Sequence, residues 1–204
     1  KSTVAAALAW RLAAKGSKVG LMDTDMHGPS IPVIFGLNDD KPEFDGDRII
    51  PVEIGDLKII STAFFLSSRT DSVIWRGPMK TGIIKQFLQN VEWGDLDYLI
   101  IDSPPGTGDE PLSVCQMIPD ADGALIVTTP QNLSTADVHR SIDFCRKLKF
   151  PIIGIVENMS GFVCPHCGNE TDIFKSGGGR MMAKAEGIPF LGTLPVNMSI
   201  MESC

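Results

Sequence analysis

Hydrophobic and polar positions fall into two kinds of segment that alternate along the chain. Short apolar runs without polar alternation are typical of parallel strands buried on both faces. Such runs occur at residues 18–22, 57–61, 98–101, 124–128, 151–156 and 190–195. Segments of helix-forming residues lie between them, at residues 2–15, 77–90, 109–117, 134–148 and 181–186. We therefore expect an α/β fold with a doubly wound, mostly parallel sheet flanked by helices, forming a single domain over residues 1–204.

Two segments depart from this alternation. Residues 31–56 become polar after a short apolar piece, and we expect an exposed excursion with a hairpin at Asp45-Gly46. Residues 62–76 are irregular and apolar, so we expect them to pack in the interior rather than to receive a partner. Their large side chains are Phe64, Phe65, Leu66 and Trp75.

The segment LDYLIIDSPPGTGD, residues 96–109, gives the first indication of chemistry. Its strand ends on Asp102, at the edge where open α/β sheets bind their ligands. Two prolines and two glycines then exclude both helix and strand over residues 103–108. A carboxylate followed by a constrained glycine loop suits a Mg²⁺–phosphate site. Taken alone, the segment is equally consistent with an ordinary strand end and a polar turn.

A second buried strand, residues 18–22, ends in the same way, with DTDMHGPS after it. Residues two apart on a strand share a face, so Asp23 and Asp25 are expected to point toward one site. A carboxylate near a γ-phosphate can orient or activate the attacking water. The alternative is a turn rich in Asp, Gly and Pro. We expect His27 to be an exposed turn residue.

The first residues, Lys1-Ser2-Thr3, match the end of a phosphate-binding loop, G-x-x-x-x-G-K-[ST]. In such a loop the lysine reaches the β- and γ-phosphates and the next hydroxyl binds Mg²⁺, while the amides of the helix N-terminus receive the anion. The alternative is a Ser/Thr cap of the helix. We expect that an N-terminal strand and the start of this loop are missing from the sequence.

Two later segments have alternative interpretations. Asn158 follows the strand at 151–156, and its amide can pair with an adenine edge or cap a turn. The segment FKSGGGR, residues 174–180, joins a glycine run to Lys175 and Arg180. It can cradle an anion or link flexibly to the helix that follows.

Composition and charge narrow the possible partners. The 204 residues include 18 basic and 25 acidic ones, a net charge of −7, which disfavours nucleic acid or an anionic membrane as a partner. No apolar stretch approaches the length that spans a bilayer, and no signal segment opens the sequence. Five cysteines with one close pair do not resemble a disulfide framework. We expect a cytoplasmic protein.

The close pair lies in GFVCPHCGN, a knuckle at about residues 161–170. A C-P-x-C-G turn can aim the thiolates of Cys164 and Cys167 at one metal. A C-x-x-C that opens a helix would instead be a redox pair, and a pair without a role is the third possibility. The residues after Cys167 are typical of a turn, which counts against the redox interpretation.

A metal at this knuckle would be short of ligands. A structural zinc site takes four protein ligands, whereas this segment offers Cys164, Cys167 and at most His166. A two-fold dimer would bring two pairs together into a four-thiolate site at the interface, able to hold zinc or a [4Fe–4S] cluster. Cys204, at the end of the sequence, is a poor additional ligand, and Cys115 and Cys145 are expected to be buried helix residues.

The motifs KST, DTDMHGPS, LIIDSPPGTGD, TTPQ, ENMSGFVCPHCG, IFKSGGG and PFLGTLP occur in this order. Together they resemble the Mrp/ApbC family of P-loop iron–sulfur cluster carrier ATPases, which are relatives of MinD and of the nitrogenase iron protein. The resemblance covers nearly the whole chain. It implies a homodimeric ATPase that holds a [4Fe–4S] cluster between subunits and passes it to apo iron–sulfur proteins, without nucleic-acid or membrane partners.

The resemblance also implies roles for individual residues. Lys1 corresponds to the phosphate-loop lysine and Ser2 to the Mg²⁺ ligand, with Thr3 beside the phosphates. Asp25 resembles the switch aspartate that positions water, with Asp23 as its neighbour. Asp102 resembles the acid that holds Mg²⁺ through water.

Other residues are assigned by the same resemblance. The second switch corresponds to residues 105–108, including Pro105, Gly106 and Gly108, and the expected nucleotide contacts are Asn158 at the adenine and Pro195. Cys164 and Cys167 resemble the ligands of the bridging cluster, with zinc as a possible substitute. ATP, ADP and Mg²⁺ are the other expected ligands.

Two other classes of function remain open at this point. One is a positioning ATPase similar to MinD or ParA, in which a structural zinc bridges the dimer. The other is a metal-bridged scaffold without enzymatic activity.

Overall fold

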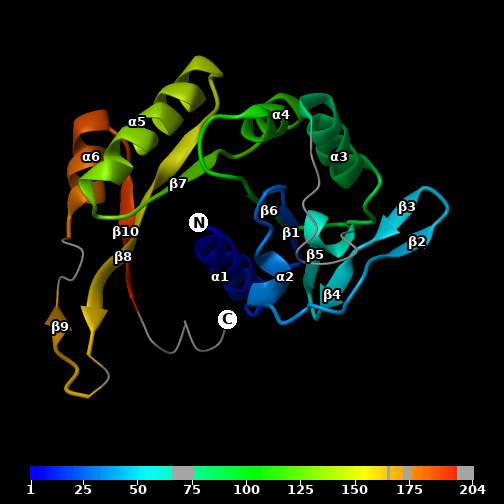
Figure 1. Ribbon diagram of the computed structural model, residues 1–204, viewed down its shortest axis with the longest axis horizontal. Helices are drawn as coiled ribbons and strands as arrows, with labels where there is room; N and C mark the ends of the chain where they lie inside the picture. The colour runs from blue at the N-terminus through cyan, green and yellow to red at the C-terminus, as the bar shows by residue number, and fades with distance from the viewer. Residues whose placement is uncertain (66–75, 165, 172–175, 197–204) are drawn as a thin grey trace. The chain divides into compact units, whose positions relative to one another are not determined.

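The computed structural model describes residues 1–65, 76–164, 166–171 and 176–196, with side chains left undescribed at 132–136, 163 and 170 (Figure 1). The chain divides into two compact units, Lys1–Met117 and Ile118–Cys204. Leu66, Trp75 and Cys204 lie outside the described residues, so what was expected of them stays a prediction.

The first unit is built on a four-stranded sheet of order β4-β5-β1-β6. Its strands are β1 (Val19–Asp23), β4 (Val52–Ile54), β5 (Leu57–Ser61) and β6 (Tyr98–Asp102). β1 pairs in parallel with β5 and with β6, and β4 is antiparallel to β5. The register aligns Asp23 with Ser61 on one side and with Asp102 on the other. Three polar residues therefore end level at one edge of the sheet.

Helices and a hairpin complete this unit. The helices are α1 (Ser2–Ala13), α2 (Ile31–Ile34), the 3-10 turn η1 (Thr62–Phe65), α3 (Gly77–Gln89) and α4 (Asp109–Met117). The strands β2 (Glu43–Asp45) and β3 (Arg48–Ile50) pair antiparallel, which confirms the hairpin expected at Asp45-Gly46. The helices expected at 2–15, 77–90 and 109–117 are confirmed to within two residues.

β1 and β6, which have similar apolar sequences, differ in how deeply they are buried. Every residue of β1 is buried. In β6 only Asp102 is buried, and Tyr98 is 46% exposed, so the expectation that this strand is buried on both faces is wrong. Within this unit's sheet, β6 is the outer strand and pairs with β1 alone. An apolar run therefore identified the strand but not its place in the sheet.

The second unit has a parallel sheet of order β10-β8-β7. Its strands are β7 (Ala124–Thr128), β8 (Ile152–Val163) and β10 (Phe190–Val196), and its helices are α5 (Asn132–Lys147) and α6 (Gly178–Glu186). The apolar faces of the helices meet the sheet in one core, made of Ile126, Val138, Ile142, Cys145, Ile155, Met182 and Ala183. The helix expected at 134–148 is confirmed.

β8 is about twice as long as the expected strand at 151–156. It continues past residue 156 to Val163 because β10 pairs with it as far as Phe162 and β9 pairs with its last two residues. Phe162 is level with Val196 of β10, and it also pairs with Thr171 of the short strand β9 (Glu170–Thr171). Asn158 therefore lies within a strand rather than after its end. Among the described helices, none has the length and apolar character needed to cross a membrane.

Candidate functional site

Hydrogen bonds fix the backbone after β1, at the edge of the first unit's sheet where Asp23, Ser61 and Asp102 are aligned. The backbone N–H of Thr24 and its hydroxyl each donate to the carbonyl oxygen of Asp102, both at 2.9 Å. Thr24 is fully buried. The loops that follow β1 and β6 therefore start from a common, rigid point.

Asp23 is fully buried, and its carboxylate is used within the protein. One oxygen accepts the Ser61 hydroxyl at 2.9 Å and the backbone N–H of Ile31 at 3.4 Å. The other accepts the backbone N–H of Asp25 at 3.1 Å. Burial raises the pKa of Asp23 to about 7, although these hydrogen bonds oppose the shift. Asp23 therefore shapes the loop that carries Asp25.

Asp25 is the more accessible of the two acids. It is half-buried, and one carboxylate oxygen accepts the backbone N–H groups of His27 at 3.2 Å and Gly28 at 3.1 Å. These bonds orient the carboxylate while its other oxygen receives no hydrogen bond from either amide. That arrangement is compatible with a water-positioning role, which stays a prediction.

Asp102 combines burial with an unused oxygen. It is 4% exposed, and Oδ2 is one of two buried side-chain oxygens without a hydrogen-bond partner in the part of the chain that the structure describes. Burial raises the pKa of Asp102, while hydrogen bonding by Ser2 and the charge of Lys1 act in the opposite direction. Such an orphaned carboxylate oxygen fits a hydrated Mg²⁺, which takes oxygen ligands and keeps its waters.

The residues at the start of α1 agree with the phosphate-loop interpretation. Lys1 occupies the N-cap position and no side chain caps the helix, so the alternative of a Ser/Thr cap is wrong. Ser2 is the first helical residue, and hydrogen bonding by Ser2 lowers the pKa of Asp102. Lys1 and Thr3 are both exposed. Ser2 and Asp102, 100 positions apart in sequence, are thus brought together as the motifs predicted.

The loop 103–108 is irregular, as predicted, and its second half is exposed. Pro105, Gly106 and Gly108 are all accessible. Gly106 has a φ of +96°, a conformation that only glycine adopts readily. α4 begins directly after the loop, at Asp109.

In the second unit, β8 and β10 bring Asn158 and Pro195 together. Asn158 is level with Leu194, the residue before Pro195. The side-chain oxygen of Asn158 accepts the backbone N–H of Met159 at 3.0 Å, and the residue is half-buried. The roles of Asn158 and Pro195 in nucleotide binding stay predictions.

Glu157 is a buried residue to which sequence reasoning gave no role. Its carboxylate accepts the Ser160 hydroxyl at 2.5 Å and the backbone N–H groups of Gly177, at 3.0 Å, and Gly179, at 2.5 Å. These donors lower the pKa of Glu157 although burial alone would raise it. The glycine run therefore does cradle an anion, but that anion is a carboxylate of this chain. The one available signal was a charged residue directly after the apolar run at 151–156.

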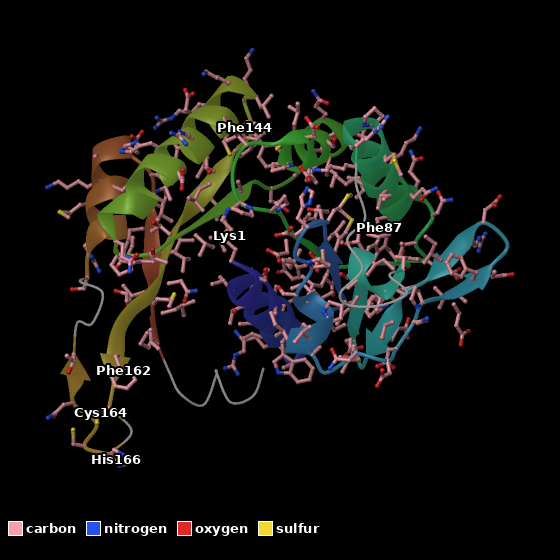
Figure 2. The ribbon with its side chains drawn as sticks, viewed as in Figure 1. Lys1, Phe87, Phe144, Phe162, Cys164 and His166 are labelled. Atoms are coloured by element: carbon pink, nitrogen blue, oxygen red, sulfur yellow. The ribbon has the colours of Figure 1, made fainter. Side chains whose placement is uncertain are left out.

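The cysteine pair lies at the tip of the hairpin formed by β8 and β9, where Figure 2 shows Cys164 and His166 beyond Phe162. The N–H of Cys164 donates to the carbonyl of Asn169 at 3.0 Å, and the N–H of Gly168 donates to the carbonyl of Cys164 at 2.9 Å. Residues 166 and 167 form a turn, and no helix begins at the described residues 168–171 that follow Cys167. This geometry counts against a redox pair at a helix N-terminus.

Both thiols are free and accessible, with Cys164 half-buried and Cys167 exposed. Hydrogen bonds from Cys167 first, and then from His166, lower the pKa of Cys164. A thiolate is the form that binds metal. Within the described residues, no group of three or more His, Cys, Asp or Glu side chains gathers around a point that could hold a metal ion. One copy of the hairpin therefore offers two thiols, fewer than the four protein ligands that a structural metal site takes.

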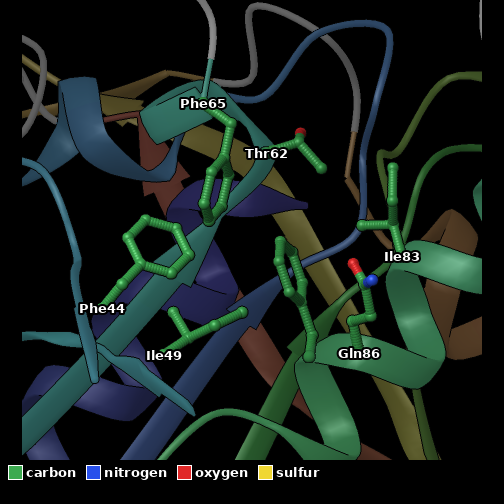
Figure 3. Close-up of a pocket in the computed structure, with 7 residues that line it drawn as sticks. Phe44, Ile49, Thr62, Phe65, Ile83 and Gln86 are labelled. Atoms are coloured by element: carbon green, nitrogen blue, oxygen red, sulfur yellow. The ribbon is translucent and has the colours of Figure 1, made fainter. Parts of the chain in front are cut away.

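An apolar pocket in the first unit involves none of the predicted site residues (Figure 3). Its volume is about 280 Å³, and the other buried oxygen without a partner, Thr62 Oγ1, belongs to its wall. The lining residues are Phe44, Ile49, Thr62, Phe65, Ile83, Gln86 and Phe87.

Comparison with solved structures identifies the class of protein. A nucleotide-binding protein from Archaeoglobus fulgidus, solved in complex with ADP, matches with a TM-score of 0.84 and 40% identity over 99% of this chain and 79% of its own. The septum site-determining protein MinD from Pyrococcus horikoshii matches with a TM-score of 0.67 at 21% identity, over 99% of this chain and 78% of its own. The fold is that of a MinD-like P-loop NTPase, as expected.

Sequence comparison identifies the family. A family model described as NUBPL iron-transfer P-loop NTPase, of the ParA group, matches residues 1–204, and the chain belongs to this family. The cytosolic Fe-S cluster assembly factor CFD1 of Kluyveromyces lactis is 49% identical over 99% of this chain and 74% of its own length. The iron-sulfur cluster carrier protein of Methanocaldococcus jannaschii is 50% identical over 100% of this chain and 70% of its own. The family resemblance seen in the motifs is confirmed.

Proposed function

We propose that the protein is an ATP-dependent iron–sulfur cluster carrier. Two copies hold one [4Fe–4S] cluster between their Cys164 and Cys167 thiolates and transfer it to apo iron–sulfur proteins. ATP, bound with Mg²⁺, is hydrolysed slowly and controls how tightly the dimer holds its cargo.

The observation that carries this proposal is the accessible hairpin with two thiols. The thiols sit at a turn where hydrogen bonds favour the thiolate of Cys164. A cargo that is handed on must be reached by the recipient, and an exposed hairpin tip meets that need better than a buried core site. Two hairpins related by a two-fold axis supply the four thiolates that a [4Fe–4S] cluster requires.

The nucleotide half of the proposal rests on the carboxyl edge of the first sheet. Lys1 and the first turn of α1 bind the phosphates, because backbone N–H groups at a helix N-terminus receive anions. The Ser2 hydroxyl and Oδ2 of Asp102, which has no hydrogen-bond partner among the described residues, would hold hydrated Mg²⁺. When bound, Mg²⁺ neutralises charge that develops on the phosphate oxygens.

Asp25 would orient the water for hydrolysis. Its loop is held by Asp23 from the buried side, so the carboxylate is presented at a fixed position. The loop 103–108 would sense the terminal phosphate through its exposed backbone. Asn158 and Pro195 would contact the base.

The relatives support this function over a positioning role. Those near 50% identity carry the names of iron–sulfur cluster assembly factors or carriers. The MinD structure, at 21% identity, supports the fold alone. The name of the K. lactis relative also describes a cytosolic factor, in agreement with the expected cytoplasmic location.

The test is anaerobic reconstitution of the protein with iron and sulfide, followed by iron, labile sulfide and zinc determination. We expect about four irons and four sulfides per dimer, lost in the Cys164→Ala/Cys167→Ala double variant. Cys115→Ala, which removes a thiol from α4, is the matched control and should retain the cluster. Uptake of zinc without sulfide by the wild-type protein would overturn cluster carriage.

A further inference from the structure

Lys80 of α3 connects two loops that the proposed function assigns to the nucleotide. Its ammonium nitrogen lies 2.9 Å from Nε2 of His27 and 2.7 Å from Oε1 of Glu110. His27 belongs to the loop after β1, and Glu110 is the second residue of α4, directly after the loop 103–108. The three residues are separated by 53 and 30 positions in sequence, so only the tertiary fold joins them.

The ion pair of Lys80 and Glu110 is largely withdrawn from solvent, whereas His27 is exposed. The side chain of Lys80 is 14% exposed and that of Glu110 is 6% exposed, whereas the surface pair of Arg48 and Glu92 has 69% and 48% exposed. A buried pair of this kind is costly to break, because each partner would leave the other charged and unpaired. The bond from the ammonium group to His27 also requires an unprotonated Nε2, since Lys80 can only donate.

On one side the bridge leads to Asp25. The carboxylate of Asp25 accepts the backbone N–H of His27, so the ring that meets Lys80 and the amide that orients Asp25 belong to one residue. A displacement of His27 therefore changes the position of the Asp25 carboxylate, which is proposed to orient the attacking water.

On the other side the bridge leads to the glycine loop. The other carboxylate oxygen of Glu110, Oε2, lies close to Gly108, where an added Cβ would come within 3.2 Å of it. The backbone N–H of Leu112 donates to the carbonyl of Gly108 at 3.3 Å. A rearrangement of residues 103–108 around a phosphate therefore moves the carboxylate that Lys80 binds.

We propose that Lys80 is a positioning residue that couples the two loops, so that the loop 103–108 and the Asp25 loop take up their hydrolytic arrangement together. This inference rests on the proposed function, because it assumes that both loops meet the nucleotide. It does not require Lys80 to touch ATP. Its effect falls on turnover rather than on affinity.

A purely structural role for Lys80 is the competing explanation. α3 and α4 are already joined by a second contact, in which the hydroxyls of Thr81 and Ser113 lie 3.0 Å apart. Ser113 in turn donates to the carbonyl of Asp109 at 2.7 Å. α3 and α4 therefore remain in contact without Lys80, whereas the contact of Lys80 with His27 does not join these two helices.

The test compares Lys80→Met with Lys85→Met, which removes an exposed lysine from the same helix. ATP affinity is measured by calorimetry and turnover under saturating ATP, at a fixed interval below each variant's Tm. We expect Lys80→Met to lower kcat at least about 10-fold, the cost of a small misplacement, with ATP affinity changed less than about 3-fold. Lys85→Met should leave both within about 2-fold.

A double variant provides a second test, because a purely structural role of Lys80 would not make the effects of Lys80→Met and His27→Ala on kcat non-additive. If Lys80 acts through His27, then His27→Ala lowers kcat alone but adds little to Lys80→Met. Full additivity of the two losses, an equal loss of affinity and kcat, or an unchanged kcat in Lys80→Met would each overturn the proposal.

Hydrogen exchange on the nucleotide-free protein separates failure of this inference from failure of the proposed function. Lys80→Met should raise exchange at least about 3-fold both at the amides of His27 and Gly28 and at residues 106–112, relative to Lys85→Met. A wild-type protein that does not hydrolyse ATP defeats the proposed function, and the coupling is then decided by this exchange alone. A change confined to one loop, or to neither, overturns the coupling.

Discussion

Two buried carboxylates, one in each compact unit, differ in their hydrogen bonding and in the direction of their pKa shifts. Asp102 ends β6 and is 4% exposed, with one oxygen that has no hydrogen-bond partner among the described residues. Glu157 lies within β8 and is fully buried, with donors at both oxygens. Burial dominates at Asp102 and raises its pKa, whereas hydrogen bonds prevail at Glu157 and lower its pKa.

The difference shows how to separate a structural acid from one reserved for a ligand. Taking a carboxylate out of water costs free energy, and hydrogen bonds from the protein offset that cost only where donors are supplied. The chain supplies Glu157 with the amides of a glycine loop. It leaves Asp102 partly unsatisfied, and a hydrated cation would complete its bonding. Asp102 is therefore the candidate ligand of a metal ion, whereas Glu157 has a structural role in holding the glycine loop.

The largest effect on stability is expected at Glu157. Glu157→Ala leaves two backbone N–H groups and the Ser160 hydroxyl without their acceptor, which should lower the free energy of unfolding by about 3–5 kcal/mol. Urea denaturation followed by circular dichroism measures this, with the exposed Glu43→Ala as a control expected within about 0.5 kcal/mol. A loss below about 1 kcal/mol for Glu157→Ala would show that the glycine loop does not depend on the carboxylate.

Asp102→Asn should have the opposite effect, with a large loss of activity and little loss of stability. We expect kcat for ATP to fall at least about 100-fold, because the charge that holds Mg²⁺ is gone. The free energy of unfolding at pH 8 should fall by less than about 1 kcal/mol or rise, since a neutral amide costs less to bury than an unsatisfied carboxylate. ATP turnover and urea denaturation on the same samples measure both. If Asp102→Asn keeps its ATP turnover but its free energy of unfolding falls by several kcal/mol, Asp102 is a structural acid and not a metal ligand.

Asp23 provides a pH test of the same comparison. Its pKa of about 7 in the folded protein lies above its ordinary value of 3.8, so between these pH values the folded state binds a proton that the unfolded chain has released. The contribution of Asp23 to stability therefore falls as pH rises through this range and is level above it. Glu157 behaves in the opposite way, because its lowered pKa means that its contribution is lost only as pH falls into the acidic range.

Urea denaturation at pH 5 and pH 8 measures the Asp23 effect. The drop in the free energy of unfolding between these pH values should be about 2–3 kcal/mol larger in the wild-type protein than in Asp23→Asn. Using the difference between the two proteins removes the contributions of other titrating groups. Equal drops in the two proteins would mean that Asp23 is ionised in the folded state at pH 5.

The smallest effect is expected at Ser61. Its hydroxyl donates to Asp23 at 2.9 Å and lowers the pKa of that carboxyl. Ser61→Ala should therefore raise the pKa of Asp23 further and reduce stability at pH 8 by about 1 kcal/mol. NMR titration of the Asp23 side-chain carboxyl carbon reports the pKa directly. A pKa that falls on substitution would contradict the bonding described at this strand end.

The sequence by itself determined the order of the main helices and strands and pointed to the candidate site residues. Apolar runs located β1, β5, β6, β7 and β10, and the helices α1, α3, α4 and α5 follow from local spacing and from glycine or proline at their ends. Asp102, the glycine loop and the Cys164–Cys167 turn are local features too. Each is specified by a few consecutive residues, so one sequence is enough to find it.

Only the tertiary structure decided which polar residues are partners. Glu157 meets Gly177 and Gly179 across 20 and 22 positions, and Lys80 meets His27 across 53. The length of β8 was likewise fixed by its neighbours β9 and β10, not by its own polar residues. Such contacts depend on which strands and helices become adjacent, and the hydrophobic pattern of a segment carries no record of that. The sequence therefore indicated the chemistry, while the fold selected the residues that position it.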